Sequence, residues 1–184
     1  MLEMAVMFTG NISRNDVVHS IDDSLLLLLN AKSVIDSHFQ KLVKGIDDFT
    51  KQLLVAVVSH DFIVGDLDKI SEIFQHLLRH QTKDEKRVDR DIRPSSLFIA
   101  GAYLEDQISI CALNALAAGY DVYLLNDVTI PRDTVHRETF IARLTQAGVV
   151  LSTVQQMLYQ WLAVETNQDR KHALRELLGY PDSI

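Results

Sequence analysis

The chain has 184 residues, of which 47% are hydrophobic, and a formal net charge of -7. This length suits a single domain over residues 1–184, and the apolar fraction is sufficient for a core that buries most of the apolar surface. The acidic balance offers no basic stripe for a phosphate backbone. We therefore expect no nucleic acid partner.

Membrane insertion and secretion are also not expected. The apolar run Leu25–Leu29 has charged residues close by on both sides and is far shorter than the roughly 20 residues that a membrane span needs. The first eleven residues carry Glu3 and lack a basic start, which argues against a secretory signal. Cys111 is the single cysteine, so an intrachain disulfide is excluded. These features favour a cytoplasmic protein.

The second half of the chain alternates short apolar runs with helical patterns, as in β-α-β units around a mostly parallel sheet. Strands are predicted at residues 96–100, 121–125 and 149–151. Helices are predicted at about 105–118, 133–147, 153–164 and 168–178, the third capped by Ser152 or Thr153. Gly119, Gly148 and Gly179 stand where helices end, because glycine readily takes the positive φ found there.

The first half gives weaker signals. Residues 4–8 and 53–58 are predicted strands, and residues 67–80 form a predicted helix. Residues 15–43 are predicted to be helical, with room for a break. The five leucines at 25–29 show no polar face, so we expect a helix that is buried on several sides or packed against a second subunit.

One segment carries an ordered set of motifs. It begins at Leu97 and reads LFIAGAYLEDQISICALNALAAGYDVYLLNDV, followed after a short gap by HRETFIARLTQAGVVLST. Over residues 97–154 this order and spacing resembles the C-terminal half of the isochorismatase-like cysteine hydrolases. The matching residues are Gly101, Ala112, Ala115, Gly119, Tyr120, Asp127, His136 and Gly148. The resemblance implies an α/β fold, a three-layer α/β/α sandwich with a mostly parallel central sheet.

The resemblance assigns the position of the family's nucleophilic cysteine to Gln107. A glutamine amide is not a nucleophile, and no neighbouring base can make it one. Leu104 stands where a threonine usually precedes the nucleophile. Glu105 and Asp106 could do acid–base work, although acids in the first turn of a helix more often complement its dipole. The pocket implied by the resemblance is lined by Gly101, Tyr103, Leu104, Glu105, Asp106 and Asp127.

The family also has an aspartate that ends its first strand, as general base, and a lysine further along. If MAVMFTGN is the first strand, Phe8 or Thr9 stands at the aspartate. If LLVAVVSHDF is the first strand, Val57 stands there. A match of residues 62–67 to the lysine motif competes with the second choice and puts Ala56 at the lysine. None of these alignments supplies the group that catalysis needs.

Two other candidates stand outside this pattern. Cys111 follows Gln107 by one helical turn and is the outside candidate for a displaced nucleophile. Its apolar neighbours favour a raised pKa and a packing role. His76 and His80 have the i, i+4 spacing of some zinc sites, but no third ligand is apparent. We expect no metal and no other cofactor.

These observations favour an isochorismatase-like protein that has lost hydrolysis and acts in binding or assembly. It would form a homo-oligomer, or a hetero-oligomer with an active paralogue, and could hold a small-molecule ligand. The Leu25–Leu29 segment and the Ile108–Ala118 helix offer apolar surfaces for assembly. The alternative is a hydrolase of a small amide, ester or vinyl ether that uses Cys111 or another group. Fold resemblance alone does not decide between them.

Overall fold

The computed structural model describes residues 19–30, 56–60 and 95–179, and its centre is a sheet of five parallel strands. The strands lie in the order β2-β1-β3-β4-β5. Their bounds are β1 Ser24–Leu29, β2 Ala56–His60, β3 Ser96–Ala102, β4 Asp121–Ile130 and β5 Val150–Ser152. The chain thus runs outward from β1 to β2 on one side, and then from β3 to β5 on the other.

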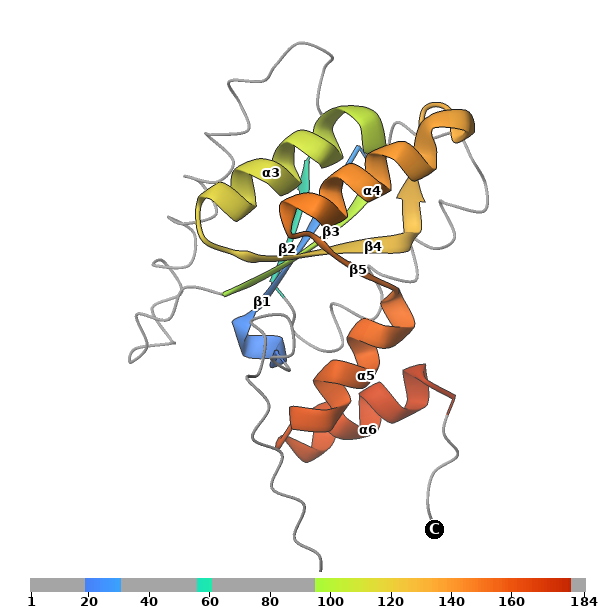
Figure 1. Ribbon diagram of the computed structural model, residues 1–184. Coiled ribbons are helices and arrows are strands. Elements are labelled where there is room, and N and C mark those ends of the chain that lie inside the picture. Colours follow the sequence, from blue (N-terminus) through green and yellow to red (C-terminus); the bar gives the residue numbers. More distant parts are fainter. Residues whose placement is uncertain (1–18, 31–55, 61–94, 180–184) are drawn as a thin grey trace, which may run out of the picture.

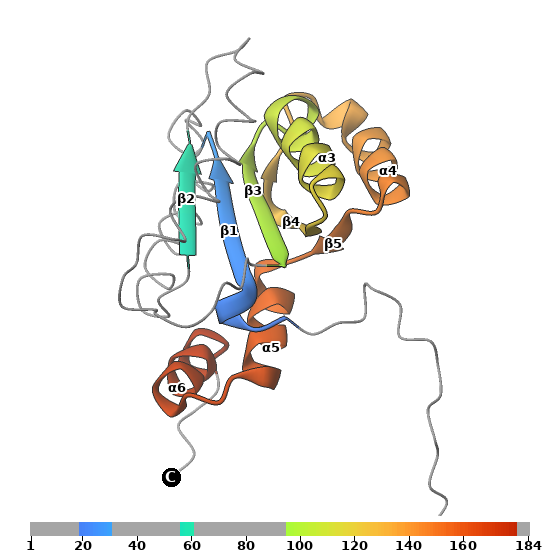
Figure 2. The same cartoon turned by 90° about the vertical axis from the view of Figure 1, so that its left-hand side faces the viewer.

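Helices cover both faces of this sheet. The described α-helices are α3 Ser109–Ala117, α4 Arg137–Ala147, α5 Val154–Val164 and α6 Gln168–Leu177. Figures 1 and 2 show α3 and α4 on one face, and α5 and α6 on the other. Short helical turns are η2 Ile21–Asp23, η3 Leu104–Ile108 and η4 Thr134–His136. The predicted α/β fold with a three-layer arrangement is confirmed.

The predicted elements of the second half are confirmed with small changes in their bounds. β3 continues beyond Ala100 to Ala102, and β4 continues beyond Leu125 to Ile130. The prediction that glycines end these helices is also confirmed, because Gly119 and Gly148 follow α3 and α4 with φ values of 91° and 110°. In this half of the chain, hydrophobic periodicity and the glycines that end helices are sufficient to predict the strands and helices.

Of the two predicted caps of α5, the structure selects Thr153. Its side chain accepts the backbone N–H of Gln156, whose own side chain accepts the backbone N–H of Thr153. This reciprocal capping box satisfies two backbone donors that the first helical turn leaves free. It fixes the position where the chain leaves β5 and turns onto the second face of the sheet.

The predicted helix at the leucine run is wrong. Leu25–Leu29 belong to β1, which lies between β2 and β3. The odd-numbered leucines pack beneath α3 and α4, whereas the even-numbered ones face α5 and α6. A parallel strand covered on both faces needs an apolar residue at every position, which explains the missing periodicity. This segment is therefore the centre of the sheet, and its leucines offer no free surface for assembly.

The second surface expected for assembly is also used largely within the fold. Ile108, Cys111, Ala112 and Ala115 are fully buried between α3 and the sheet. The small side chains of Cys111, Ala112 and Ala115 let the helix lie close to the strands. The predicted strand at 53–58 overlaps β2 at residues 56–58, and the elements predicted at 4–8 and 67–80 lie outside the described residues.

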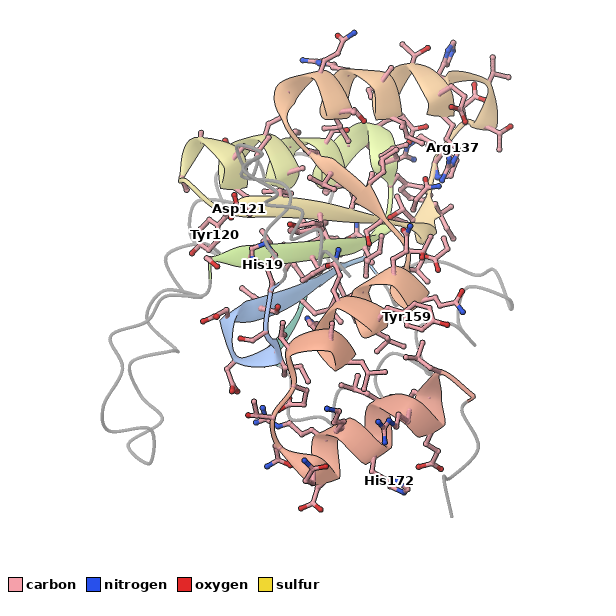
Figure 3. All side chains as sticks on the ribbon, turned by 60° about the horizontal axis from the view of Figure 1, so that its bottom comes forward. His19, Tyr120, Asp121, Arg137, Tyr159 and His172 are labelled. Carbon is pink, nitrogen blue, oxygen red and sulfur yellow. The ribbon has the colours of Figure 1, made fainter. Side chains whose placement is uncertain are left out.

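A buried aromatic cluster holds α5 on its face of the sheet. Phe98 of β3 stacks on Tyr123 of β4, and its ring meets the edge of Trp161 from α5. The indole N–H of Trp161 donates to the hydroxyl of Ser24, at 3.1 Å. His19 Nε2 lies 2.9 Å from the Tyr123 hydroxyl. Figure 3 shows His19 at the same end of the sheet as Asp121, the first residue of β4.

At Gly101 the backbone of β3 lies close to that of β1. It pairs with Leu29 in the register of β1 and β3, and its φ is 120°. A Cβ at this position would lie 1.9 Å from the Leu29 carbonyl oxygen, with two further backbone atoms of Leu29 within 2.9 Å. Backbone atoms in the middle of a sheet cannot move aside. Only glycine therefore fits here.

We expect Gly101→Ala to lower the free energy of unfolding by about 3 kcal/mol or more, because it combines a backbone clash with a strained φ. Gly119→Ala is the matched control. Its φ is 91°, but no atom lies within 4 Å of the place that the added methyl group would take, so only the conformational penalty of roughly 1–2 kcal/mol applies. Urea denaturation of both variants measures the difference. Equal losses would contradict the close approach.

The His19–Tyr123 pair predicts a pH dependence of stability. Burial lowers the pKa of His19 below its usual 6.5, against the opposing charges of Asp121 and Asp23. The unfolded chain then binds the proton at higher pH than the folded one, so the free energy of unfolding falls as the pH drops below 6.5. Urea denaturation at pH 7.5 and 5.5 should show a smaller fall for His19→Gln than for the wild type. An unchanged difference between the two pH values would contradict this assignment.

Candidate functional site

The candidate site lies where β3 ends and the chain turns into η3. From β1 the chain crosses to β2 on one side, whereas β3 leads to β4 on the other. The carboxyl ends of β1 and β3 therefore form a topological switch point, the place where open parallel sheets bind ligands. The segment from Gly101 to Asp106, which contains most of the predicted pocket residues, occupies this edge.

A π-helical turn joins the strand to α3. The backbone N–H of Ile108 donates to the carbonyl of Tyr103 at 3.4 Å, five residues back. The peptide bond between Ala102 and Tyr103 is cis. π-helical turns are uncommon in proteins, and those that occur often lie at functional sites. Within this turn, Leu104, Gln107 and Ile108 are buried.

Gln107 is the buried polar residue of this turn. It is 8% exposed, and its Oε1 has no hydrogen-bond partner among the described residues. A buried amide oxygen without a donor is destabilising by roughly 1–3 kcal/mol. Gln107 Oε1 is therefore a buried acceptor that the described residues leave unsatisfied.

Asn30 is a site residue that the sequence analysis missed. It directly follows β1, is 3% exposed and has a φ of 52°, a left-handed conformation that asparagine tolerates. Its Nδ2 donates to the carbonyl of Ala102 at 2.8 Å. Asn30 therefore lies beside the end of β3, at the switch point. The sequence does carry a signal for this residue, because Asn30 is a polar residue directly after an apolar run. A helical interpretation of that run does not place Asn30 at the end of a strand.

Of the two strands considered for the general base, the one that the structure describes does not place an acid here. Val57 lies in β2, which β1 separates from β3. Ala56 is in the same strand, and Phe8 and Thr9 lie outside the described residues. The strand next to β3 on this side is β1, and the residue that directly follows it is Asn30.

Glu105 and Asp106 are engaged with the loop after β4. The Glu105 carboxylate accepts the backbone N–H groups of Arg132 and Asp133, at 2.7 and 3.2 Å. Asp106 forms an ion pair and hydrogen bonds with the Arg132 guanidinium, which also lies 4.3 Å from the centre of the Tyr103 ring. Both acids thus connect η3 to this loop through hydrogen bonds. Exposed ion pairs of this kind contribute little to the free energy of folding.

The other predicted pocket residues serve the fold. The carboxylate of Asp127 accepts the backbone N–H of Val154 at 3.1 Å from each oxygen, so it complements the start of α5. Leu104 is fully buried in the cluster beneath α3 and α4. The structure therefore brings Gly101, Tyr103 and Leu104 together with Gln107, and places Asp127 on the beginning of α5.

Cys111 is buried in the same core cluster. It has no exposed surface, and burial raises the pKa of its thiol to about 12. A thiol is nucleophilic only as the thiolate. At neutral pH the thiolate is about 10⁵-fold rarer than the thiol at that pKa, and no reactant can reach it without opening the core.

Metal ligands do not gather in the part of the chain that is described. No group of three or more His, Cys, Asp or Glu side chains there could hold an ion. His76 and His80 lie outside the described residues. In the described segments, no helix is long and apolar enough to cross a membrane.

A parallel sheet with this strand order and a switch point beside Gly101 define an open α/β domain that binds ligands at the carboxyl ends of its strands. The chain matches no protein-family model. In sequence it is 30% identical over 107 residues to isochorismatase domain-containing protein 2 of Xenopus laevis. That match covers 58% of this chain and 49% of the relative, so it spans about half of the relative's length.

Solved structures share the fold. The YcaC gene product of Escherichia coli, an octameric hydrolase of unknown specificity, superposes with a TM-score of 0.64 at 17% identity, over 88% of this chain and 90% of that one. The MAR1 ribonuclease of Caenorhabditis elegans gives a TM-score of 0.61 at 12% identity, over 90% and 95%. The resemblance to the isochorismatase-like superfamily is confirmed.

The burial of Cys111 predicts its reactivity. We expect no labelling of the native protein by iodoacetamide at pH 7 to 9, and complete labelling in denaturant, because the thiol is inaccessible and protonated. Intact mass gives an unambiguous readout, since the chain has a single cysteine. Rapid labelling of the native protein with an apparent pKa below 8.5 would instead indicate an activated cysteine.

Proposed function

We propose that this chain is an isochorismatase-like protein, a single domain, that does not hydrolyse substrates and acts as a binding and assembly protein. The observation that carries the proposal is a buried amide, Gln107, at the position that the resemblance assigns to the nucleophile. An amide cannot attack a carbonyl carbon or form a covalent intermediate.

The position of Asn30 supports the same conclusion. A general base must lie within hydrogen-bond reach of the nucleophile it activates. The nucleophile position follows β3, and β1 is the neighbouring strand on the side of the switch point. We therefore assign the family's acid position to Asn30, which is again an amide and cannot accept a proton at neutral pH.

The hydrogen bond of Asn30 indicates that this amide is adapted to its place. Its Nδ2 donates to the Ala102 carbonyl. A carboxylate in the same position would direct an anionic oxygen at that carbonyl oxygen, which it cannot bond. The neutral side chain thus holds the end of β1 against the end of β3, where an ionised base would repel it.

Binding at this edge is supported by the Oε1 of Gln107, which accepts no hydrogen bond from the described residues. A small ligand with an N–H or O–H donor would satisfy it and remove the penalty of a buried unpaired acceptor. Assembly is supported by analogy with the octameric YcaC gene product, which has the same fold. Association with a second copy agrees with the homo-oligomer expected from the sequence, and a paralogue remains the other partner considered.

The alternative function, hydrolysis of a small amide, ester or vinyl ether, depends on Cys111 as a displaced nucleophile. Its burial and its raised pKa weigh against this role. The acids near the site do not support hydrolysis either, because Glu105 and Asp106 form hydrogen bonds and an ion pair with the loop that contains Arg132.

We expect neither the wild type nor Gln107→Cys to hydrolyse nicotinamide, a substrate of the resembling family. Loss of a nucleophile or its base costs enzymes on the order of 10⁴- to 10⁶-fold in rate, and Gln107→Cys restores the first without the second. Ammonia release, measured beside an active nicotinamidase as positive control, gives the readout.

Cys111→Ser separates the two hypotheses. If the wild type releases ammonia and Cys111→Ser does not, the hydrolase function is correct and the proposal fails. If Gln107→Cys alone is active, a working base is already present, and the assignment of the acid position to Asn30 is wrong.

A further inference from the structure

The beginning of η3 is held by the loop and short turn at residues 131–136. This segment follows β4 directly, and the last two residues of β4 pair with Gly101 and Ala102 of β3. The loop therefore runs beside η3 from its first residue. Arg132 of this loop contacts three of the four residues that precede Gln107.

These contacts form a unit that we call the Arg132 clasp. The backbone N–H of Arg132 donates to the Glu105 carboxylate at 2.7 Å, and the Arg132 guanidinium forms an ion pair with Asp106. The guanidinium also lies 4.3 Å from the centre of the Tyr103 ring, within the range of a cation–π interaction. One residue thus connects the loop to two acids and an aromatic ring at the beginning of η3.

The local hydrogen bonds at the beginning of η3 are long. The backbone N–H groups of Asp106 and Ile108 donate to the Tyr103 carbonyl at 3.2 and 3.4 Å, compared with the usual distance of about 2.9–3.0 Å. Tyr103 stands at the cap position, and its side chain accepts no backbone N–H there. The first turn of a helix that lacks such a cap depends on partners from elsewhere in the fold. The Arg132 clasp provides them.

The clasp is exposed, whereas the residue that follows it along the chain is buried. The side chains of Arg132 and Asp106 are 52% and 37% exposed. Exposed ion pairs are weak and are screened by salt. Gln107 is buried, and its Oε1 accepts no hydrogen bond from the described residues, a penalty that contact with water removes. Opening of the clasp therefore costs little free energy, and hydration of Gln107 offsets part of this cost.

We propose that the Arg132 clasp is a conformational switch of the candidate site. While the clasp is closed, η3 keeps Gln107 buried. When it opens, η3 moves away from the loop and Gln107 becomes accessible to a ligand. Arg132 is a positioning residue in this switch, because it acts through η3 and does not contact the ligand. The inference rests on the proposed function, in which Gln107 belongs to the binding site.

Alkylation of Gln107→Cys by iodoacetamide measures the exposure of position 107. We expect Arg132→Ala, added to Gln107→Cys, to accelerate labelling roughly threefold or more, as the loss of an exposed ion pair allows. Iodoacetamide is uncharged, so the change in protein charge does not alter its local concentration. Loss of a nearby cation also disfavours the thiolate and slows alkylation. Faster labelling therefore reports exposure.

Two controls accompany this measurement. Arg175→Ala removes the same charge from an exposed position on α6, which lies on the other face of the sheet (Figures 1 and 2). With Gln107→Cys it should be labelled at the rate of Gln107→Cys alone. Cys111 is the internal monitor of unfolding, because it is fully buried in the core and reacts only if the core opens. Tandem mass spectrometry of the digested protein distinguishes the two positions.

Salt provides a second measurement that needs no substitution of Arg132. Raising the ionic strength from about 0.01 M to about 1 M shortens the screening length from about 30 Å to about 3 Å. We expect the labelling rate of Gln107→Cys to rise about twofold over this range, because the exposed ion pair weakens. The variant that also carries Arg132→Ala should show no such rise, since its clasp is already open.

Three results would overturn the switch. The first is an equal labelling rate with Arg132→Ala and with Arg175→Ala. The second is labelling of Cys111 together with position 107, which would show that the whole core opens. The third is a rate for Gln107→Cys that does not change with salt. These outcomes are distinct from those of the proposed function, because labelling involves no substrate. Hydrolysis of nicotinamide by the wild type would overturn the proposed function and leave the clasp unaffected.

Discussion

The contact of Gly101 with the Leu29 carbonyl brings β1 and β3 together at the centre of the sheet. The chain leaves these two strands toward opposite edges, so their carboxyl ends form a topological switch point. At this point Asn30 contacts Ala102 and η3 begins. A side chain at position 101 would separate the strands and with them the two amides of the site.

The leucine run shows why part of the fold could not be predicted from the sequence. Periodicity distinguishes helices from strands when one face meets water, as it does for α4 with its buried Ile141 and Leu144. β1 meets water on neither face. A continuous apolar run then fits a buried helix or a buried strand equally well, and only its short length, five leucines, favours the strand.

The same ambiguity limited the prediction of the site. Gln107 could be placed by counting back from Gly119, because the helix and its terminal glycine fixed the spacing. Asn30 could not be placed, since its role depends on β1 being a strand and on its pairing with β3. Glu105 and Asp106 were recognised as acids near the pocket, but their partner Arg132 lies more than twenty residues away and no local pattern links them.

The two amides of the site, Asn30 and Gln107, lie at the carboxyl ends of the central strands. Beside them, the loop after β4 is held against η3 by Glu105 and Asp106. Neither amide carries a charge at neutral pH, and neither can take up a proton there. Catalysis by acid and base requires groups that titrate, whereas recognition through hydrogen bonds does not. The proposed loss of hydrolysis is therefore compatible with binding on the same scaffold.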